Sequence, residues 1–338
     1  MPKRRPAKKR SPAAAVLLAV LCLLLLAVSR YLDSRSEPAA SVSAPEAAQA
    51  DASGLEVHFL DIGQGDSALL FCGDETLLID GGKVKNNQKL IARLKELEVD
   101  HLDAVICSHP DEDHCGGLSA VLASTRTDAF YCSVDSWHTK VFSDVTKYVA
   151  EQGISVTIPQ AGDTFAFSDA SVEFLGPVVD YGDDPNEGSL VARVRYGETS
   201  FLFTGDMGFE AEDDMLAAGV DVSATVLKVA HHGSAGSSST EFLQAVHPQY
   251  AVISVGADND YGHPTEAALN RLSACGIPVY RTDLLGEIIA VSDGKTVTIT
   301  SASNEAPPAS DAASQTAGSY GYVGNSSSKV VHLASCGK

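Results

Sequence analysis

The feature that most constrains the fold is a short apolar run that stops abruptly at a dense group of ionisable residues. Residues 104–107 (Ala-Val-Ile-Cys) have the pattern of a buried strand, and five of the six positions from 109 to 114 are ionisable. Packing gives no reason to place that much charge at the end of a buried strand. A divalent cation does, because it takes imidazole nitrogen and carboxylate oxygen as ligands. The spacing His-x-Asp-x-Asp-His therefore predicts a metal-binding turn rather than a solvated acidic loop, formed by His109, Asp111, Asp113 and His114.

Four other apolar runs, which end near residues 60, 79, 203 and 230, also lead into polar or ionisable residues. In the first of these, glycines at positions 63 and 65 let the backbone turn tightly and present the residues that follow. A single Asp after a strand is usually a turn or a helix cap. Together with residues 109–114, however, these strand ends predict one shared crevice. The residues concerned are Asp61, Asp66, Ser67, Asp80, Asp206, His231, His232 and Ser234.

One more histidine stands at a rigid place in the chain. His263 is followed by Pro264, which fixes the entry into a helix expected over 265–275. The alternative is an exposed histidine in a loop.

The charge balance limits the kinds of partner. The net charge is −20, which argues against broad electrostatic wrapping of nucleic acid by clustered Lys and Arg. It does not exclude a nuclease, because bound metal ions can neutralise a local acidic site. The seven cysteines include no CxxC pair, so no disulfide framework is expected, and those at positions 72, 107, 115, 132 and 275 are interpreted as core or near-core thiols.

The two ends of the chain differ in composition from the middle. Six basic residues in the first ten precede an apolar run over 13–28, which predicts a signal peptide or membrane anchor over 1–29. Either form predicts export, with the product extracellular or anchored and facing outside. Residues 30–54, rich in Ala, Ser, Pro and Glu, predict a disordered linker, and 301–338 a flexible low-complexity tail. The tail's His332 and Cys336 resemble the end of small zinc-binding modules, but a plain tail is the better interpretation.

Residues 55–300 predict a single α/β domain. Strands come first, then strands and helices interleave, and strands come last. That order suits two mixed sheets with helices on their outer faces, a four-layer αββα sandwich. The helices are expected over 87–97, 118–123, 141–150, 209–218, 241–246 and 265–275.

These motifs resemble the metallo-β-lactamase-fold hydrolases and, within them, the soluble domain of the ComEC-like competence proteins. The resemblance covers residues 55–300 in the expected order. The pieces that carry it are FLDIGQGDS (59–67), LIDGG (78–82), SHPDEDHCGG (108–117), TGD (204–206), HHGS (231–234) and GHP (262–264).

The resemblance implies an αββα sandwich with two metal ions at one edge. Asp80 would orient the ligand loop. His231 and His232 would supply a further ligand or the proton donor, with the two roles left open. The expected catalytic groups are therefore Asp113, His231 and His232. Six positions match the family's metal ligands: His109 and Asp111 at the first metal, Asp113 and His114 at the second, Asp206 between them, and His263 as the last ligand.

Two departures from the family pattern affect the choice of metal. The commoner motif, His-x-His-x-Asp-His, has a histidine where this chain has Asp111. The usual ligand histidine before the bridging Asp is absent, and Asn186 to Ser189 lie where this subfamily places a polar substitute. The first site is therefore richer in oxygen, which shifts preference from zinc towards manganese or magnesium. We expect two divalent ions, zinc or manganese, with magnesium as a further option.

The function that follows is a metal-dependent phosphodiesterase or nuclease acting on extracellular DNA or a cell-wall phosphodiester. A hydroxide held between the metals would attack phosphorus, and His231 or His232 would protonate the leaving oxygen. Residues 67, 233 and 234 could donate to the phosphate. The residues expected to support the ligands or contact phosphate are Asp61, Asp66, Ser67, Asp80, Asn186, Ser189 and Ser234.

Two alternatives remain open at this stage. One is a hydrolase of another ester or amide class, of lactonase or β-lactamase type, which the oxygen-rich first site disfavours. The other is a non-catalytic binding protein on the same fold, which the intact Asp113, His114 and Asp206 disfavour. The expected partners are a phosphodiester substrate, with DNA as one candidate, and a membrane if the N-terminal segment is uncleaved. No obligate protein partner is evident.

Overall fold

The structure is a computed structural model that describes residues 54–257, 259–302, 322–324 and 331–333. The segment predicted as signal peptide or anchor (1–29) lies outside the described residues, as do all but the last residue of the predicted linker (30–54) and most of the predicted tail. Within the described part of the chain, no helix is both long and apolar enough to cross a bilayer.

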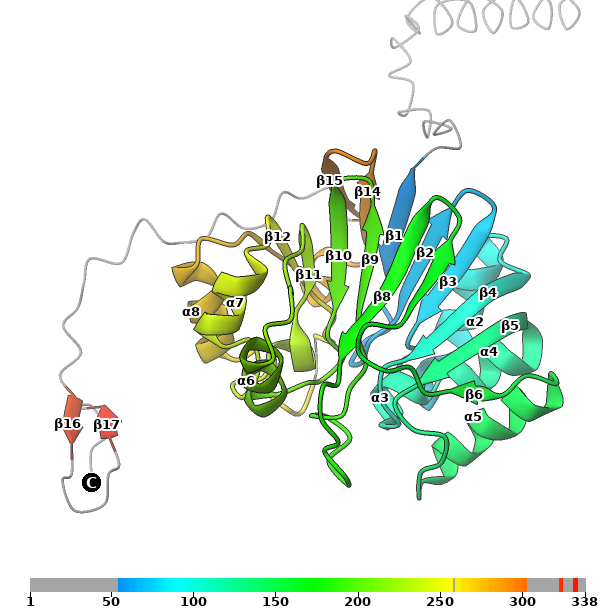
Figure 1. Ribbon diagram of the computed structural model, residues 1–338, viewed down its shortest axis with the longest axis horizontal. Helices are drawn as coiled ribbons and strands as arrows, with labels where there is room; N and C mark the ends of the chain where they lie inside the picture. Colours follow the sequence, from blue (N-terminus) through cyan, green and yellow to red (C-terminus); the bar gives the residue numbers. More distant parts are fainter. Residues whose placement is uncertain (1–53, 258, 303–321, 325–330, 334–338) are drawn as a thin grey trace, which may run out of the picture. The chain divides into compact units, whose positions relative to one another are not determined.

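The first sheet has eight strands and carries the metal-binding turn predicted from the sequence (Figure 1). Its outer half is antiparallel, and the strands from β3 to β6 run parallel to one another. In spatial order the strands are β15 (Val297–Ser301), β14 (Ile288–Ser292), β1 (Leu55–Phe59), β2 (Ala68–Cys72), β3 (Glu75–Ile79), β4 (His101–Cys107), β5 (Arg126–Cys132) and β6 (Val156–Thr157).

The second sheet has seven strands and is also mixed. The four strands from β10 to β13 are parallel, and the others pair antiparallel. In spatial order they are β13 (Val279–Arg281), β12 (Tyr250–Ile253), β11 (Val226–Lys228), β10 (Thr199–Phe203), β9 (Val191–Tyr196), β8 (Ala170–Gly176) and β7 (Thr164–Phe167).

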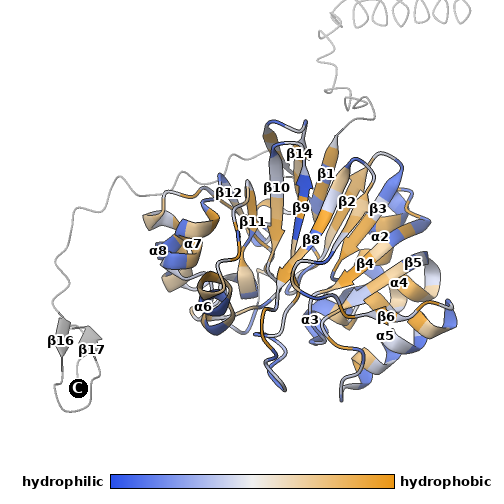
Figure 2. Ribbon diagram, viewed as in Figure 1, coloured by the Kyte–Doolittle hydropathy of each residue, from blue (hydrophilic) through white to orange (hydrophobic). Residues whose placement is uncertain are grey.

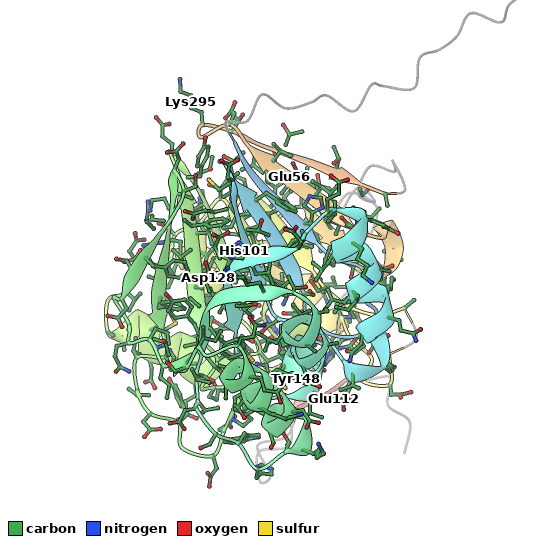
Figure 3. The ribbon with its side chains drawn as sticks, turned by 90° about the vertical axis from the view of Figure 1, so that its right-hand side faces the viewer. Glu56, His101, Glu112, Asp128, Tyr148 and Lys295 are labelled. Carbon is green, nitrogen blue, oxygen red and sulfur yellow. The ribbon has the colours of Figure 1, made fainter. Side chains whose placement is uncertain are left out.

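Helices cover the outer face of each sheet, and a shared core lies between the sheets (Figures 1 and 3). In α2, Leu90 and Leu94 are one turn apart and are the buried face of an otherwise polar helix. The first sheet is covered by α2 (Asn87–Glu96), α4 (Leu118–Ser124) and α5 (Lys140–Glu151), and the second by α6 (Phe209–Ala217), α7 (Thr240–Val246) and α8 (Glu266–Ala274). Single turns complete the chain: η1 (Val84–Asn86), α3 (Glu112–Cys115), η2 (Ala230–Gly233) and α9 (Thr282–Leu285).

The layer order confirms the predicted four-layer αββα sandwich. Its physical cause is visible in Figure 2, where the strands of both sheets are largely hydrophobic while hydrophilic residues line the outer helices. The inner core takes Val57, Phe59 and Ile106 from the first sheet and Phe174 and Phe203 from the second. Both sheets therefore bury one face against each other and the other face against helices.

The structure departs from the sequence expectations mainly at element ends. Strand β4 begins at His101 rather than at residue 104, and the predicted metal-binding turn contains one turn of helix, Glu112–Cys115. Within 301–338, predicted as a plain tail, β16 (Tyr322–Gly324) and β17 (Val331–Leu333) pair antiparallel. The five cysteines in the described domain are free thiols, and four of them are buried, as the spacing predicted.

Candidate metal centre

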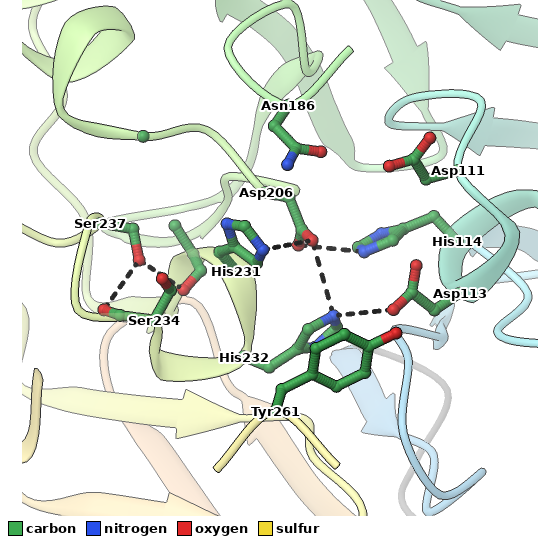
Figure 4. Close-up of polar contacts among 12 residues, drawn as sticks. Asp111, Asp113, His114, Asn186, Asp206, His231, His232, Ser234, Ser237 and Tyr261 are labelled. Atoms are coloured by element: carbon green, nitrogen blue, oxygen red, sulfur yellow. Dashed lines mark hydrogen bonds and ion pairs between the residues drawn. The ribbon is translucent and has the colours of Figure 1, made fainter. Parts of the chain in front are cut away.

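The polar residues singled out in the sequence gather where parallel strands of both sheets end. The turn after β4 carries His109 and His114, the turn after β10 carries Asp206, and the turn after β11 carries His232. Carboxyl ends of parallel strands meet at one edge of a sheet, which explains why residues so far apart in the chain converge. The predicted shared crevice is therefore built from two sheets (Figure 4).

Four buried side chains form the centre of this group: Asp66, His114, Asp206 and His232. We call them the metal-centre quartet. Each offers one ligand atom, and these atoms all lie within 4.8 Å of one another. Two imidazoles and two carboxylates within one cation's reach are a donor set suited to zinc, manganese or iron.

Asp206 is the residue on which the imidazoles converge. Its Oδ1 lies 3.0 Å from His114 Nε2, and its Oδ2 lies 3.6 Å from the Nε2 atoms of both His231 and His232. Asp113 approaches from the other side, with its Oδ2 3.7 Å from His232 Nε2. These are the contacts drawn in Figure 4. One carboxylate thus faces three histidines, and the role of Asp206 as a ligand between two cations stays a prediction.

Four atoms of the centre are buried and make no hydrogen bond: the Nε2 atoms of His109, His114 and His232, and Oδ1 of Asp206. Two of them, His114 Nε2 and Asp206 Oδ1, nevertheless face each other as an ion pair at 3.0 Å. A buried polar atom without a partner costs about 1–3 kcal/mol. Four of them pointing into one small region therefore indicate a missing binding partner. A divalent cation fits, because it accepts lone pairs from both nitrogen and oxygen.

The side predicted to hold the first metal is only partly assembled from buried groups. The His109 ring is fully buried, 4.2 Å from the His114 ring between centroids, and its Nε2 lies 3.9 Å from Asp111 Oδ2. The Asp111 side chain is 41% exposed. Asn186, whose Oδ1 is also buried without a partner, faces this side together with Asp111 (Figure 4). Oxygen donors therefore outnumber nitrogen donors on this side.

Asp80 holds the ligand turn in place. Its Oδ1 accepts a hydrogen bond from the Ser108 backbone N–H at 2.7 Å, and its Oδ2 accepts one from the Ser108 hydroxyl at 2.8 Å. The same Oδ2 lies 2.9 Å from His114 Nδ1. With Nδ1 occupied, the His114 ring directs Nε2 towards Asp206. This is the orienting contact that a metal-binding histidine usually makes.

Two glycine-bearing turns touch directly behind the ligands. The Gly81 N–H donates to His114 O at 2.7 Å, and the Gly117 N–H donates to Gly82 O at 2.8 Å. A Cβ on Gly117 would lie 2.0 Å from Gly81 O, so no other residue fits without displacing the turn. The glycines after Asp80 and His114 thus allow the two loops to approach.

Asp66 has a partner that the sequence analysis missed. Lys228, buried at the end of β11, forms an ion pair with Asp66 Oδ2 and donates to Val229 O at 2.8 Å. Asp66 Oδ1 lies 3.1 Å from His232 Nδ1, which also hydrogen-bonds Ser254 O at 2.9 Å. The only sequence signal was one lysine inside the apolar run Val226–Val229.

The charges of the centre are strongly coupled. Burial, reinforced by the neighbouring His114, lowers the pKa of His109 to about 3. Burial would lower the pKa of His114 as well, but the carboxylates of Asp206 and Asp80 raise it well above its ordinary value. Asp206 and Asp66 likewise outweigh burial at His232 and raise its pKa to about 9. Without a cation, His114 and His232 therefore pair as cations with the buried carboxylates, whereas His109 is neutral.

The remaining histidines lie around the quartet rather than in it. His231 is partly exposed and has a positive φ of 51°. His263 is half-buried, and its ring lies 5.6 Å from that of His231 and 6.4 Å from that of His232. The structure thus places His232, rather than His263, beside His114 and Asp206, and the assignment of His263 as last ligand stays a prediction.

The predicted supporting residues divide into two groups. Ser67 donates to Asp80 O at 3.1 Å, and Ser189 Oγ accepts from the Asp206 N–H at 3.1 Å, so both brace the ligand turns. Asp61 pairs instead with Lys89 at 2.8 Å on the surface. The Ser234 hydroxyl accepts from the Gly236 N–H at 3.3 Å within its own loop.

A second group of possible ligands lies at the other ends of β4 and β5 (Figure 3). There His101 Nε2 is 3.1 Å from Asp128 Oδ2, and the Asp103 carboxylate accepts from the Thr76 N–H at 2.7 Å. These side chains are partly exposed and already paired, so the group differs from the quartet.

Comparisons with known proteins agree with this geometry. A family model described as the metallo-beta-lactamase superfamily matches residues 60–257. The chain is 34% identical over 285 residues to the competence protein ComA of Neisseria gonorrhoeae, which covers 82% of this chain and 38% of that relative. It is 31% identical over 251 residues to ComE operon protein 3 of Bacillus subtilis (strain 168), covering 69% of this chain and 32% of that relative.

The chain thus spans about a third of the length of these two curated relatives. Among solved structures, the metallo-beta-lactamase fold protein YhfI from Bacillus subtilis is 14% identical with a TM-score of 0.48, over 73% of this chain and 100% of that one. The family match covers every member of the metal-centre quartet and the strands that carry them. The chain belongs to the metallo-beta-lactamase superfamily.

Proposed function

We propose that this protein is an exported metal-dependent phosphodiesterase that acts on DNA outside the cytoplasm. The observation that carries the proposal is the buried quartet of Asp66, His114, Asp206 and His232, with unpaired ligand atoms directed into one region. Similarity to competence proteins supports DNA over a cell-wall phosphodiester as the substrate. The net charge of −20 accords with a role for bound cations in admitting a phosphate.

The residues around Asp206 would hold two divalent cations. His114 and Asp113 would bind one of them together with His232, and His109 and Asp111 the other. When bound, the cations would supply Lewis acidity that activates water and offsets the negative charge developing on phosphate. The oxygen-rich side at Asp111 favours manganese or magnesium over zinc.

The two adjacent histidines have different surroundings, which suggests different roles. His232 is buried, its Nδ1 is held by Ser254 O, and its Nε2 points to Asp206 and Asp113, as a ligand requires. His231 is partly exposed, and its Nε2 lies 3.6 Å from Asp206 Oδ2. Its partly exposed imidazole is accessible to a leaving oxygen, to which it could donate a proton. We assign His231 as the proton donor.

Leaving-group dependence tests this assignment. A p-nitrophenolate ion leaves readily without a proton, whereas the sugar oxygen of DNA does not. His231→Ala should therefore slow cleavage of a DNA oligomer at least about 100-fold, a typical acid-catalysis effect, and slow bis-p-nitrophenyl phosphate turnover much less. His232→Ala, the matched control, should reduce both reactions together with metal content. Equal losses on both substrates in His231→Ala would contradict the assignment.

A substrate screen tests the proposal as a whole. The purified domain should hydrolyse bis-p-nitrophenyl phosphate and plasmid DNA with manganese or magnesium, and Asp113→Ala should not. Turnover of nitrocefin or a lactone alone would favour a hydrolase of another ester or amide class. No turnover of any of these substrates with any divalent ion would favour a binding protein on the same fold. Metal analysis of the same preparation gives the number of ions bound.

Export is tested separately, because it rests on residues 1–29 alone. We expect cells that make the full chain to expose the domain to protease added outside, and we expect loss of residues 1–29 to abolish this exposure. The N-terminal segment would also be the route of membrane association if it stays uncleaved. No obligate protein partner is part of the proposal.

A further inference from the structure

Tyr261 is the most exposed large hydrophobic side chain in the described part of the chain, at 59%. It lies on the loop that follows β12, and its hydroxyl contacts Lys83, whose Nζ is 3.8 Å from Asp113 Oδ2 of the metal centre (Figure 4). A ligand that binds next to an exposed aromatic ring can cover the ring and remove its apolar surface from water. Tyr261 is exposed near the metal centre, so its ring is available to such a ligand.

The ring is held in place although it is not buried. Its hydroxyl pairs with Lys83 Nζ at 3.2 Å, and its face stacks on His263 with a centroid separation of 5.8 Å and an interplanar angle of 25°. The Tyr261 backbone N–H donates to Asn259 Oδ1 at 3.2 Å. His263 thus supports the ring and Lys83 lies over it, while 59% of the side chain stays exposed to solvent.

Asn259 organises the whole loop. Its side-chain amide donates to Gly256 O at 2.8 Å and to His263 O at 2.7 Å, and its Oδ1 also accepts from the His263 N–H at 3.0 Å. These bonds join both ends of the segment that presents Tyr261. A preordered loop loses less conformational entropy when a ligand binds.

Lys83 brings a positive charge to the same place. Its Nζ lies 4.9 Å from the Tyr261 ring centroid and 3.8 Å from Asp113 Oδ2. The chain has a net charge of −20, so this lysine provides a local positive charge, between the aromatic ring and the ligand turn, in an otherwise acidic protein. An ammonium group there can contact a phosphate oxygen next to the one that reaches the metal centre.

We propose that Tyr261 and Lys83 form a nucleotide-binding subsite, in which the Tyr261 ring stacks on an unpaired base and Lys83 contacts the adjoining phosphate. This inference rests on the proposed phosphodiesterase function and narrows its substrate to single-stranded nucleic acid. A base inside a duplex is already stacked on both sides, so it cannot use the ring. A polyol-phosphate polymer of the cell wall has no base to stack.

Binding with and without bases provides the first test. We would compare, by fluorescence anisotropy, a labelled oligothymidylate with an abasic oligomer of the same length, both phosphorothioate-linked to resist cleavage, in the presence of the activating cation. Stacking of one base on an aromatic side chain contributes about 1–3 kcal/mol, so the wild type should prefer the oligomer with bases by roughly 5-fold or more. A duplex of the same length should bind like the abasic oligomer.

Variants test whether the Tyr261 ring causes the preference for the oligomer with bases. Tyr261→Leu should bring the ratio of the two affinities close to one, and Tyr261→Phe should preserve it. Tyr148→Leu is the matched control, because Tyr148 on α5 also has a lysine, Lys147, over its ring at 4.7 Å (Figure 3). It should leave the ratio unchanged. Lys83→Gln should weaken both oligomers about equally.

Two failures remain distinguishable. If the wild type hydrolyses bis-p-nitrophenyl phosphate but binds both oligomers equally, or if Tyr261→Leu keeps the preference, the subsite is overturned and the phosphodiesterase proposal stands. If no divalent ion supports turnover of that diester, the proposed function itself is overturned, and the subsite proposal falls with it.

Discussion

Two histidine–carboxylate clusters in the described part of the chain are each built around a buried imidazole, and they differ in how its nitrogens are satisfied. In the first, which we call the His58 cluster, His58 lies 2.7 Å from both Glu56 and Glu287, and Arg93 binds Glu287 through two hydrogen bonds of 2.7 and 2.9 Å. Both nitrogens of its imidazole have partners. In the metal-centre quartet, Nε2 of His114, Nε2 of His232 and Oδ1 of Asp206 have only ion-pair contacts of 3.0 to 3.7 Å and make no hydrogen bond.

The comparison teaches that residue type alone does not identify a binding site. Histidine and carboxylate that satisfy one another form a structural contact, whereas the same groups with unmet hydrogen-bonding capacity mark a place for a ligand. The predictions below test whether the two clusters respond differently to substitution, to metal and to pH.

The largest effect on stability is expected at Lys228. It belongs to the metal centre, but it forms an internal ion pair with Asp66, as the partners in the His58 cluster do. Lys228→Met leaves a buried carboxylate without its cation, which should lower the free energy of unfolding by about 3–5 kcal/mol. Urea denaturation of the metal-free protein measures it. The double variant Lys228→Met/Asp66→Asn should recover much of the loss. If it is no more stable than the single variant, the ion pair is not the cause.

Asp206→Asn should separate metal binding from stability. The wild type should gain thermal stability when manganese or zinc is added, because a ligand that binds only the folded state stabilises it. The variant should lose this gain and bind metal at least about 100-fold more weakly, since Asp206 faces three imidazoles. Thermal shift and isothermal titration calorimetry measure both. His58→Gln, the control, should keep the metal-dependent gain.

Asp80→Asn should have a smaller effect of the same kind. The substitution keeps an oxygen for Ser108 but weakens the hold on His114 Nδ1. Supporting partners of metal-binding histidines typically contribute 10–100-fold to affinity, and we expect a loss of about that size. Calorimetric titration of metal into the variant checks it. An unchanged affinity would mean that packing alone orients His114.

His58→Gln should have the smallest effect, about 1–2 kcal/mol of stability with no change in metal affinity. Glu287 keeps Arg93, and Glu56 is partly exposed, so neither carboxylate is left buried and alone. Urea denaturation of the variant against wild type measures the loss. A loss of metal binding in this variant would break the distinction between the two clusters.

The difference in stability between the wild type and His58→Gln should depend on pH. Burial would lower the pKa of His58, but Glu287 and Glu56 raise it above its ordinary value of 6.5. A raised folded-state pKa means that the contribution is complete below pH 6.5 and disappears as pH rises through the higher folded value. The stability difference between wild type and His58→Gln should therefore shrink from pH 6.5 upwards. A difference that grows over that range would contradict a charged His58.

The fold and the approximate site could be predicted because their signals are local. Apolar runs that stop at His109, Asp80 or Asp206 mark both the strand and the edge where its ligands lie, and the 3.6-residue period marks helices such as α2. Lys228, Asn259 and Tyr261 were missed because their roles depend on residues far away in the chain. A lysine in a strand does not reveal a buried carboxylate partner, and a tyrosine in a loop does not reveal its exposure.

The ligands come from both sheets, and this has a consequence for the resistance of the protein to heat and proteolysis. Asp66 and His114 come from the sheet that contains β1 to β6, while Asp206 and His232 come from the other sheet. A cation bound by these four residues would link the two sheets of the sandwich at this edge. Resistance to heat and to proteolysis would then increase with the metal concentration around the protein. The protein would be most resistant under the same conditions in which it is active.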